Sequence, residues 1–243
     1  MGNKGATEES RFNYTGTENL EIMAEAVNYN AYLSQLVFEH TSKYKRIVDF
    51  GSGIGTFAES LRNAGRDITC IEPDSNQYAT LVGLGFRCCA DIAELPDESV
   101  DAIYTLNVLE HIPDDMAALR KLYAKLAPGG GLLIYVPAFQ ILFSSMDEKV
   151  GHCRRYNRSD LTEKIRAAGF HVHESRYVDS LGFPASIAYK LFGSRSGEIN
   201  RSMLKIYDRF VFPISCTIDR LTGRWFGKNL LIIADKLCTT TTK

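Results

Sequence analysis

Short apolar runs rich in β-branched residues alternate with amphipathic stretches between residues 46 and 138. The runs have the length and composition of buried strands, and apolar positions spaced three and four apart between them indicate helices. Strands that alternate with helices in this way form parallel sheets covered on both faces. We therefore predict the strands RIVDF, DITCIE, FRCCAD, VDAIYTL and LLIYVP, with helices over 56–64, 75–84 and 114–126.

The segments on either side of this region have a different spacing of apolar residues. Before the first strand, residues 18–43 follow a helical spacing that is interrupted at Asn28-Tyr29-Asn30, which predicts two short helices after a polar tail. After Pro137, a loop-like stretch leads to a helix that is predicted to begin at a Ser159 cap. The strand HVHESRYV, a helical insertion over 183–226 that Pro213 kinks or divides, and the strand NLLIIADKL complete the chain.

Composition excludes several classes of function. The 28 basic and 29 acidic side chains leave a net charge of −1, so nucleic-acid binding through a broad positive field is not expected. The six cysteines lack the spacing of metal ligands, and we expect free thiols and no metal site. The amino terminus does not resemble a signal peptide and no apolar run is long enough to span a bilayer, which predicts a cytoplasmic protein.

The strongest chemical signal is a glycine-rich loop at the end of the first strand, Asp49-Phe50-Gly51-Ser52-Gly53-Ile54-Gly55. Glycine at every second position lets backbone amides approach a ligand closely. Dinucleotide-binding loops use the spacing G-x-G-x-x-G, and here the third glycine comes one residue early, which disfavours a nicotinamide oxidoreductase. A tight turn without a ligand is the alternative interpretation.

An acidic residue, Glu72, ends the second strand about twenty residues after Gly51. A carboxylate at this position can accept hydrogen bonds from both hydroxyls of a ribose. Because many cofactors contain a ribose, Glu72 alone does not distinguish between them.

The order and spacing of the motifs resemble the class I S-adenosylmethionine-dependent methyltransferase family over nearly the whole chain. The glycine loop and Glu72 match its first two motifs, Asp91-Ile92 falls where that family contacts adenine, and the stretches 107–111 and 126–131 match those after its fourth strand and before its fifth. The Gly-His-x-Arg-Arg-Tyr segment at 151–156 is similar to a type 11/12-like subgroup, some of whose members accompany polyprenyl-linked or glycan chemistry.

The resemblance implies S-adenosyl-L-methionine as cofactor and a Rossmann-like α/β fold with a mostly parallel seven-stranded sheet. Tyr14 and Tyr29 are candidates to cover the methionine moiety, with core packing as the alternative. The expected cofactor-binding residues are Asp49, Gly51, Ser52, Gly53, Gly55, Glu72, Pro73, Asp91, Ile92, Asn107, Val108 and Tyr29.

We expect one methyltransferase domain over 1–243. Residues 1–45 form the amino-terminal tail and helices, and 46–138 form the cofactor-binding core. Residues 139–243 form the acceptor side, with the helical insertion and the last strand.

His152 is the first candidate for catalysis, because it follows the fifth strand on the side where ligands bind in parallel sheets. A histidine beside two arginines should lose basicity and be neutral, as a general base must be. Arg154, Arg155 and Tyr156 are candidates for substrate binding, since arginines clamp anionic groups. The alternative is a structural turn whose arginines pair with Asp147, Glu148 or Asp160. His111, between Leu109 and Ile112, is a second candidate base or a partly buried helix-border residue.

These features predict direct in-line methyl transfer to an oxygen or nitrogen of a small-molecule or lipid-linked acceptor, without a covalent intermediate or obligatory metal. The alternatives are an RNA or protein methyltransferase and a noncatalytic binder of the cofactor. The Asp/Asn-Pro-Pro-aromatic motif of base-methylating enzymes does not follow the fourth strand. The basic amphipathic stretch 201–226 is either a surface for peripheral membrane contact or a helix packed on the sheet. Acceptor identity and oligomeric state stay open.

Overall fold

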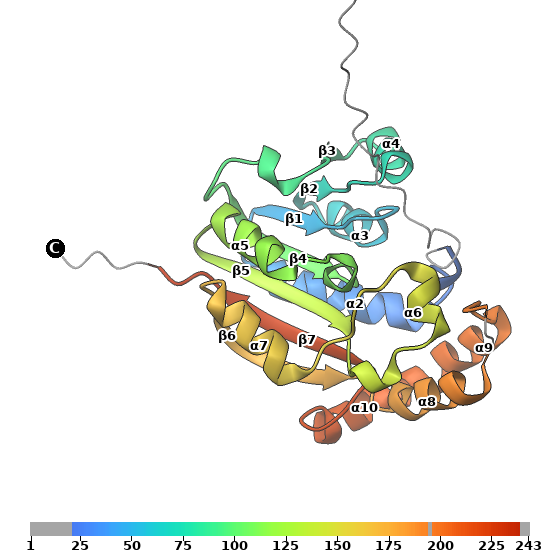
Figure 1. The fold of residues 1–243 in the computed structure, drawn as a ribbon. Coiled ribbons are helices and arrows are strands. Elements are labelled where there is room, and N and C mark those ends of the chain that lie inside the picture. The colour runs from blue at the N-terminus through green and yellow to red at the C-terminus, as the bar shows by residue number, and fades with distance from the viewer. Residues whose placement is uncertain (1–20, 194–195, 239–243) are drawn as a thin grey trace, which may run out of the picture.

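A single seven-stranded sheet forms the centre of the computed structural model, which describes residues 21–193 and 196–238 (Figure 1). The strand order is β3-β2-β1-β4-β5-β7-β6. The first five strands pair in parallel, whereas β7 runs antiparallel to β5 and β6. This confirms the predicted mostly parallel α/β fold. The strands are β1 (Arg46–Phe50), β2 (Asp67–Ile71), β3 (Arg87–Cys89), β4 (Val100–Leu106), β5 (Leu126–Pro137), β6 (His171–Val178) and β7 (Asn229–Asp235).

Helices cover both faces of the sheet because consecutive strand residues point to opposite sides. In β5, Ile134 and Val136 belong to one apolar core, whereas Leu133 and Tyr135 belong to the other. The first core is closed by α5 (Asp115–Lys125) and α7 (Arg158–Ala167). The second is closed by α2 (Val27–Thr41), α3 (Thr56–Asn63) and α4 (Ser75–Gly83). The helices predicted within the core agree with α3, α4 and α5 to within one or two residues.

The predicted break at Asn28-Tyr29-Asn30 is wrong. Helix α2 continues through these residues, and the chain turns earlier, at residues 24 and 25. The carboxylate of Asp208 accepts hydrogen bonds from the backbone amides of Asn28 (2.9 Å) and Tyr29 (2.8 Å). A residue far along the chain therefore caps this helix, and no local spacing could reveal it. The predicted tail at 1–17 and Tyr14 lie outside the described residues.

The second half of the chain contains more helix than we predicted. The expected loop after β5 includes α6 (Ser145–Val150), which begins with a capping box between Ser144 and Asp147. Helix α7 starts directly after Asn157, so the predicted Ser159 cap is wrong. Strand β5 begins before the Pro128-Gly129-Gly130 turn that was expected to separate it from α5.

The predicted helical insertion before the last strand is present. It comprises α8 (Gly182–Phe192), α9 (Arg201–Ile206), a π-helical turn (Tyr207–Val211) and α10 (Phe212–Thr222). Pro213 lies in the first turn of α10, directly after the π-helical turn. The backbone stays helical from residue 201 to 222, so the helix is distorted here but not divided. Within the described part of the chain, no helix has the length and hydrophobicity needed to cross a membrane.

Candidate active site

The glycine loop leaves the carboxyl end of β1 and lies against the segment that follows β4. Gly51, Gly53 and Gly55 all have positive φ, a backbone conformation that favours glycine. A Cβ on Gly51 would lie 2.3 Å from Cγ2 of Val108, so only glycine allows the two segments this close an approach. The loop predicted from the sequence is therefore a tightly constrained turn at the edge of the sheet where ligands bind in parallel α/β folds.

Glu72, directly after β2, braces this loop. One oxygen of its carboxylate accepts a hydrogen bond from the amide of Gly53 (2.8 Å), and the other accepts one from the amide of Asp74 (2.9 Å). Glu72 is only 6% exposed, and burial raises the pKa of its carboxyl group. Each carboxylate oxygen accepts more than one hydrogen bond, so this bracing leaves capacity for a ribose hydroxyl.

Asp49, the last polar residue of β1, has a buried carboxylate beneath the loop. Its Oδ2 atom makes no well-formed hydrogen bond among the described residues, although the buried Tyr104 hydroxyl lies near the carboxylate and opposes part of the pKa increase that burial causes. Burial raises the pKa of Asp49 to about 7. A buried polar atom without a partner is costly unless a ligand compensates it, and a carboxylate suits a cationic group. The carboxylates at this edge of the sheet therefore fit a cofactor that carries an amino group, a sulfonium and a ribose.

The remaining predicted cofactor residues follow the next two strands. Asp91, after β3, accepts a hydrogen bond from the amide of Ala93, which lowers its pKa, and pairs with Lys121 at 3.3 Å. Ile92 is 1% exposed within the core, whereas Pro73 is exposed at the rim. Their contacts with a cofactor stay predictions.

Asn107, after β4, has a left-handed backbone with φ of 55°. Its side-chain amide donates to the hydroxyl of Tyr29 at 3.4 Å. The Tyr29 ring packs edge-on against Tyr135 and Phe212, and burial raises its pKa. Tyr29 thus lies beside a predicted cofactor residue, while its ring contacts are those of a core residue.

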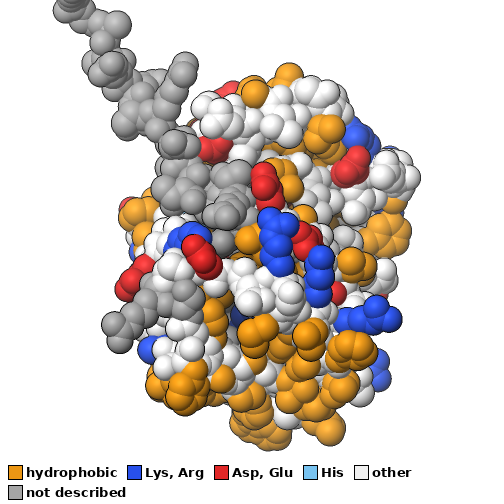
Figure 2. Space-filling model, turned by 90° about the vertical axis from the view of Figure 1, so that its right-hand side faces the viewer, with side chains coloured by type: hydrophobic (Ala, Val, Ile, Leu, Met, Phe, Trp, Pro, Cys, Tyr) orange, Lys and Arg blue, Asp and Glu red, His pale blue; other side chains and the backbone are white. Residues whose placement is uncertain are grey.

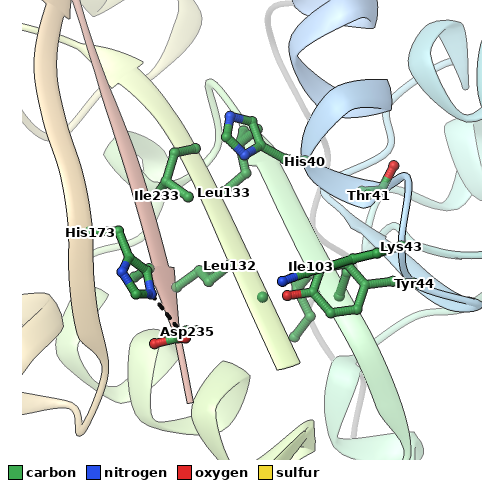
Figure 3. Close-up of a pocket in the computed structure, with 13 residues that line it drawn as sticks. His40, Thr41, Lys43, Tyr44, Ile103, Leu132, Leu133, His173, Ile233 and Asp235 are labelled. Carbon is green, nitrogen blue, oxygen red and sulfur yellow. Dashed lines mark ion pairs between the residues drawn. The ribbon is translucent and has the colours of Figure 1, made fainter. Parts of the chain in front are cut away.

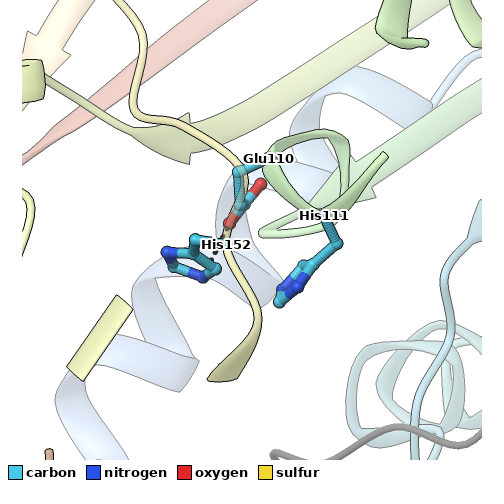
Figure 4. A group of neighbouring side chains, drawn as sticks. All are labelled: Glu110, His111 and His152. Carbon is cyan, nitrogen blue, oxygen red and sulfur yellow. Dashed lines mark ion pairs between the residues drawn. The ribbon is translucent and has the colours of Figure 1, made fainter. Parts of the chain in front are cut away.

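His111 and His152 come together with a third residue, Glu110, whose role the motif at 107–111 did not indicate (Figure 4). The ring centroids of the two histidines are 4.6 Å apart, and Nε2 of His152 is 3.7 Å from Oε1 of Glu110. The ligand atoms of the three residues all lie within 4.8 Å of one another, so the cluster could also hold one divalent cation.

Burial controls the electrostatics of this cluster. Glu110 is 0% exposed, and neither carboxylate oxygen has a hydrogen-bond partner in the described part of the chain. Burial raises the pKa of Glu110 to about 7. Burial lowers the pKa of His111 to about 4, so this ring is neutral at pH 7.

His152 is oriented by a carboxylate rather than by the arginines beside it in sequence. Its Nδ1 lies 2.7 Å from Oδ1 of Asp147, and Asp147 also accepts two hydrogen bonds from the guanidinium of Arg155. Burial alone would raise the pKa of Asp147, but these contacts lower it to about 2. The premise that cations surround His152 is therefore wrong, since its ring lies between Asp147 and Glu110.

The other residues of the segment use their polar groups inside the protein. Arg154 donates to the carbonyls of Ile112 and Pro113 and pairs with Asp115. The Tyr156 hydroxyl donates to Asp115 and to the Leu109 carbonyl, and its side chain is buried. This geometry favours the structural-turn interpretation for Arg154, Arg155 and Tyr156; their acceptor contacts stay predictions.

A small cavity of about 100 Å³ lies at the opposite end of the sheet (Figure 3). It is lined by His40 at the end of α2, by Tyr44 after that helix, and by residues of β4, β5 and β7. His173 of β6 and Asp235 of β7 complete the lining. Ala102 and Gly131 lie early in their parallel strands, so the cavity is remote from the carboxyl ends that carry the predicted site. It holds none of the predicted site residues.

Comparisons with known proteins show the family to which the chain belongs. A family model described as a methyltransferase domain matches residues 19–175. A probable S-adenosylmethionine-dependent methyltransferase of Mycolicibacterium smegmatis is 27% identical over 186 residues, which cover 72% of each chain. A ubiquinone biosynthesis O-methyltransferase of Xanthomonas oryzae is 32% identical over 99 residues, which cover 37% of this chain and only 41% of that protein.

A solved structure of a methyltransferase has the same fold. The crystal structure of an S-adenosylmethionine-dependent methyltransferase from Archaeoglobus fulgidus superimposes with a TM-score of 0.59 at 17% identity, over 86% of this chain and 93% of that one. The family model covers more than half of the chain, and the glycine loop with Asp49 and Glu72 suits the family's cofactor. The protein therefore belongs to the methyltransferase-domain family and is an S-adenosylmethionine-dependent methyltransferase.

Proposed function

We propose that this enzyme transfers a methyl group directly, in line, to an oxygen or nitrogen nucleophile of a small-molecule or lipid-linked acceptor. The observation that carries the proposal is the hydrogen-bonded pair of His152 and Asp147, which adjoins Glu110 after β4. Support for an oxygen acceptor comes from the partial similarity to ubiquinone biosynthesis O-methyltransferases. The net charge of −1 supports a small acceptor over RNA.

The cofactor supplies an electrophilic methyl group on its sulfonium sulfur. In this proposal, the carboxylate of Asp49 balances the positive charge of the methionine moiety, and Glu72 accepts hydrogen bonds from the ribose hydroxyls while it holds Gly53 in place. Asp91 recognises the exocyclic amine of adenine. The other contacts come from Gly51, Ser52, Gly55, Pro73, Ile92, Asn107, Val108 and Tyr29.

His152 takes the proton of the acceptor. Asp147 accepts a hydrogen bond from Nδ1–H of His152, and this tautomer leaves the lone pair of Nε2 available for a proton. Arg155 fixes Asp147 through two hydrogen bonds. Such an arrangement orients the imidazole and stabilises its protonated form, as a carboxylate does for a catalytic histidine in other enzymes. Here Arg155 acts on the base rather than on the acceptor.

Calorimetry with S-adenosylhomocysteine tests the cofactor part. We expect Glu72→Ala to weaken binding by about 1 to 3 kcal/mol, because it removes a buried hydrogen-bond acceptor and the brace of the loop. The matched control is Glu163→Ala, which removes an exposed carboxylate on α7 and should leave affinity unchanged. Equal affinities of Glu72→Ala and the parent protein would contradict the assignment.

Transfer of a labelled methyl group from S-adenosylmethionine tests the acceptor part. Lipid extract, water-soluble extract and total RNA are offered separately, and label in the RNA fraction alone would contradict the proposal. We expect His152→Ala to lower turnover by about 10² to 10⁴-fold with unchanged cofactor affinity and melting temperature. The exposed His171, 53% accessible at its side chain, provides the control variant His171→Ala. Loss of turnover on chelation that an added divalent cation restores would assign the cluster to a cation, because His152 is one of the three possible ligands.

A further inference from the structure

The insertion carries a row of apolar side chains that point away from the protein. Their spacing along α9, the π-helical turn, α10 and the turn that follows it is that of one helix face. Each is between 56% and 76% exposed, although side chains of this kind are usually buried. We call this row the outer stripe, and its members are Met203, Ile206, Phe210, Ile214, Leu221 and Trp225.

The opposite face of the same helices is polar and buried. Asp208 accepts hydrogen bonds from the amides at the start of α2, and Asp219 accepts them from the amides of Asp179 (2.7 Å) and Ser180 (2.8 Å). Ser215, 0% exposed, accepts one from the amide of Leu181. The fold therefore uses the polar face of the insertion, with Phe212 as its buried apolar anchor, and the described residues include no element that covers the outer stripe.

More exposed apolar side chains lie at the same end of the molecule. Leu191 and Phe192, at the end of α8, are 66% and 86% exposed, and Ile141 is 67% exposed. Figure 2 shows the hydrophobic side chains gathered in the lower part of the molecule, over the region that α8, α9 and α10 occupy in Figure 1. Contiguous apolar surface of this kind marks a contact with a membrane, a ligand or another protein.

The charge of this region distinguishes among those partners. Residues 182–228 contain eight Lys or Arg and three Asp or Glu, a net charge of +5, so the rest of the chain carries −6. Two of the three acidic residues are Asp208 and Asp219, which are buried on the inner face. Arg209 lies over the ring of Phe210, and Arg220 and Arg224 flank the stripe further along. Glu25, outside this range, pairs with Arg201 (2.7 Å) and Lys205 (2.9 Å) and offsets part of the charge, so the exposed side is apolar with arginines at its edge.

We propose that the outer stripe is a docking surface for membranes that contain anionic lipids. An apolar face edged by Arg and Lys, with Trp and Phe among its apolar residues, matches interfacial helices that bury one face at the headgroup boundary. Two copies joined through this surface would oppose their positive charges. The inference rests on the lipid-linked acceptor of the proposed function only for its biological purpose, because the surface itself needs no methyl transfer.

Trp225 makes the docking directly measurable, because it is the only tryptophan of the chain and belongs to the outer stripe. The intact protein is mixed with vesicles of phosphatidylcholine, with or without about 30% phosphatidylglycerol and with no acceptor present. We expect a blue shift of Trp225 fluorescence, quenching by brominated lipid, and at least about tenfold stronger partitioning to the anionic vesicles. Because exposed charges are screened by salt, about 0.5 M salt should weaken this binding.

Variants locate the surface. Met203→Gln, Phe210→Gln and Leu221→Gln together keep Trp225 as reporter and should lower partitioning by about tenfold or more, with melting temperature and S-adenosylhomocysteine affinity unchanged. The control is Val82→Gln with Leu84→Gln at the remote end of α4, where exposures are 49% and 43%. Arg209→Gln with Arg224→Gln should reduce the preference for anionic vesicles, whereas Arg120→Gln on α5 should not.

Several outcomes would overturn the proposal. They are absence of vesicle binding, equal binding to neutral vesicles, equal binding by the triple variant, and a dimer in light scattering that the triple variant abolishes. The last outcome would assign the stripe to a second copy. A protein that binds S-adenosylhomocysteine but no vesicle refutes the docking surface alone. One that docks but methylates no offered fraction refutes the proposed acceptor alone.

Discussion

Buried carboxylates lie in two regions of this enzyme, and the two regions use them differently. At the ligand-binding edge of the sheet, Asp49 and Glu110 have oxygens without hydrogen-bond partners among the described residues. In the insertion, Asp208 and Asp219 each accept two backbone amides from other segments. A carboxylate that accepts hydrogen bonds from distant backbone amides holds segments of the fold together, whereas a buried carboxylate with an unpaired oxygen is a candidate to bind a ligand.

The same two regions also differ in how much apolar surface they expose. The helices around the cofactor edge bury their apolar faces against the sheet, but α9 and α10 direct theirs outward. We assign the unpaired carboxylates of the first region to a ligand and the uncovered outer stripe of the second to a surface contact. Four changes would break or sharpen this distinction.

The largest effect is expected for Gly51→Ala at the cofactor edge. Its Cβ would clash with Val108, and its φ of +81° is unfavourable for alanine, so the loop must shift. We expect loss of S-adenosylhomocysteine affinity by about 100-fold or more in calorimetry, since loop shifts of an ångström cost this much. Gly85→Ala is the matched control, because it has the same backbone strain (φ +80°) but no atom within 4 Å of the added Cβ. If both variants lose affinity equally, the close approach of Gly51 to Val108 has no special role.

Asp219→Ala should have the next largest effect, on stability. It leaves the amides of Asp179 and Ser180 buried without acceptors, which should cost about 2 to 4 kcal/mol of unfolding free energy in urea denaturation. Phe210→Gln, on the outer stripe of the same helical segment, is the comparison and should change little. Equal costs would mean that the outer stripe stabilises the fold.

Asp49→Asn tests the unpaired carboxylate of Asp49 through the pH dependence of stability. The folded pKa of about 7 lies above the unfolded value of about 3.9, so protonated Asp49 favours the fold at low pH and this stability is lost as pH rises to 7. The amide that replaces the carboxyl group does not titrate. Without ligand, the variant should therefore gain about 1 to 3 kcal/mol over the parent between pH 5 and 8, measured by urea denaturation.

Ligand binding should favour the parent protein over Asp49→Asn. The ammonium group of S-adenosylhomocysteine prefers ionised Asp49, so this ligand should bind the parent protein about tenfold more tightly at pH 8 than at pH 6. Its affinity for the variant should not change in this pH range. A parent affinity that does not change with pH would separate Asp49 from the ligand.

The smallest effect is expected on the outer stripe. Ile214→Gln should change the unfolding free energy by less than about 0.5 kcal/mol, because the side chain is 56% exposed and the substitution removes no buried contact. A larger loss in thermal or urea unfolding would show that Ile214 belongs to the core rather than to a docking surface.

The sequence was most informative where local patterns are complete in themselves. VDAIYTL and HVHESRYV form β4 and β6 with the predicted bounds, because a run of β-branched and aromatic residues carries its own strand preference. The glycine loop could also be predicted from the sequence, since its positive φ angles are a local requirement that glycine meets. The candidate His152 was found from its place after β5, but its partner Asp147 and its neighbour Glu110 were not assigned.

The chain by itself determined the alternation of strands and helices, the parallel sheet and the cofactor loop. The tertiary structure alone decided which polar groups meet. Asp208 caps α2 through Asn28, 180 residues earlier in the chain, and this removed the break expected there. The spacing of 201–226 showed an amphipathic insertion without saying which face would be buried. The polar face turned inward because distant backbone amides needed acceptors, and such long-range hydrogen bonds leave no trace in local periodicity.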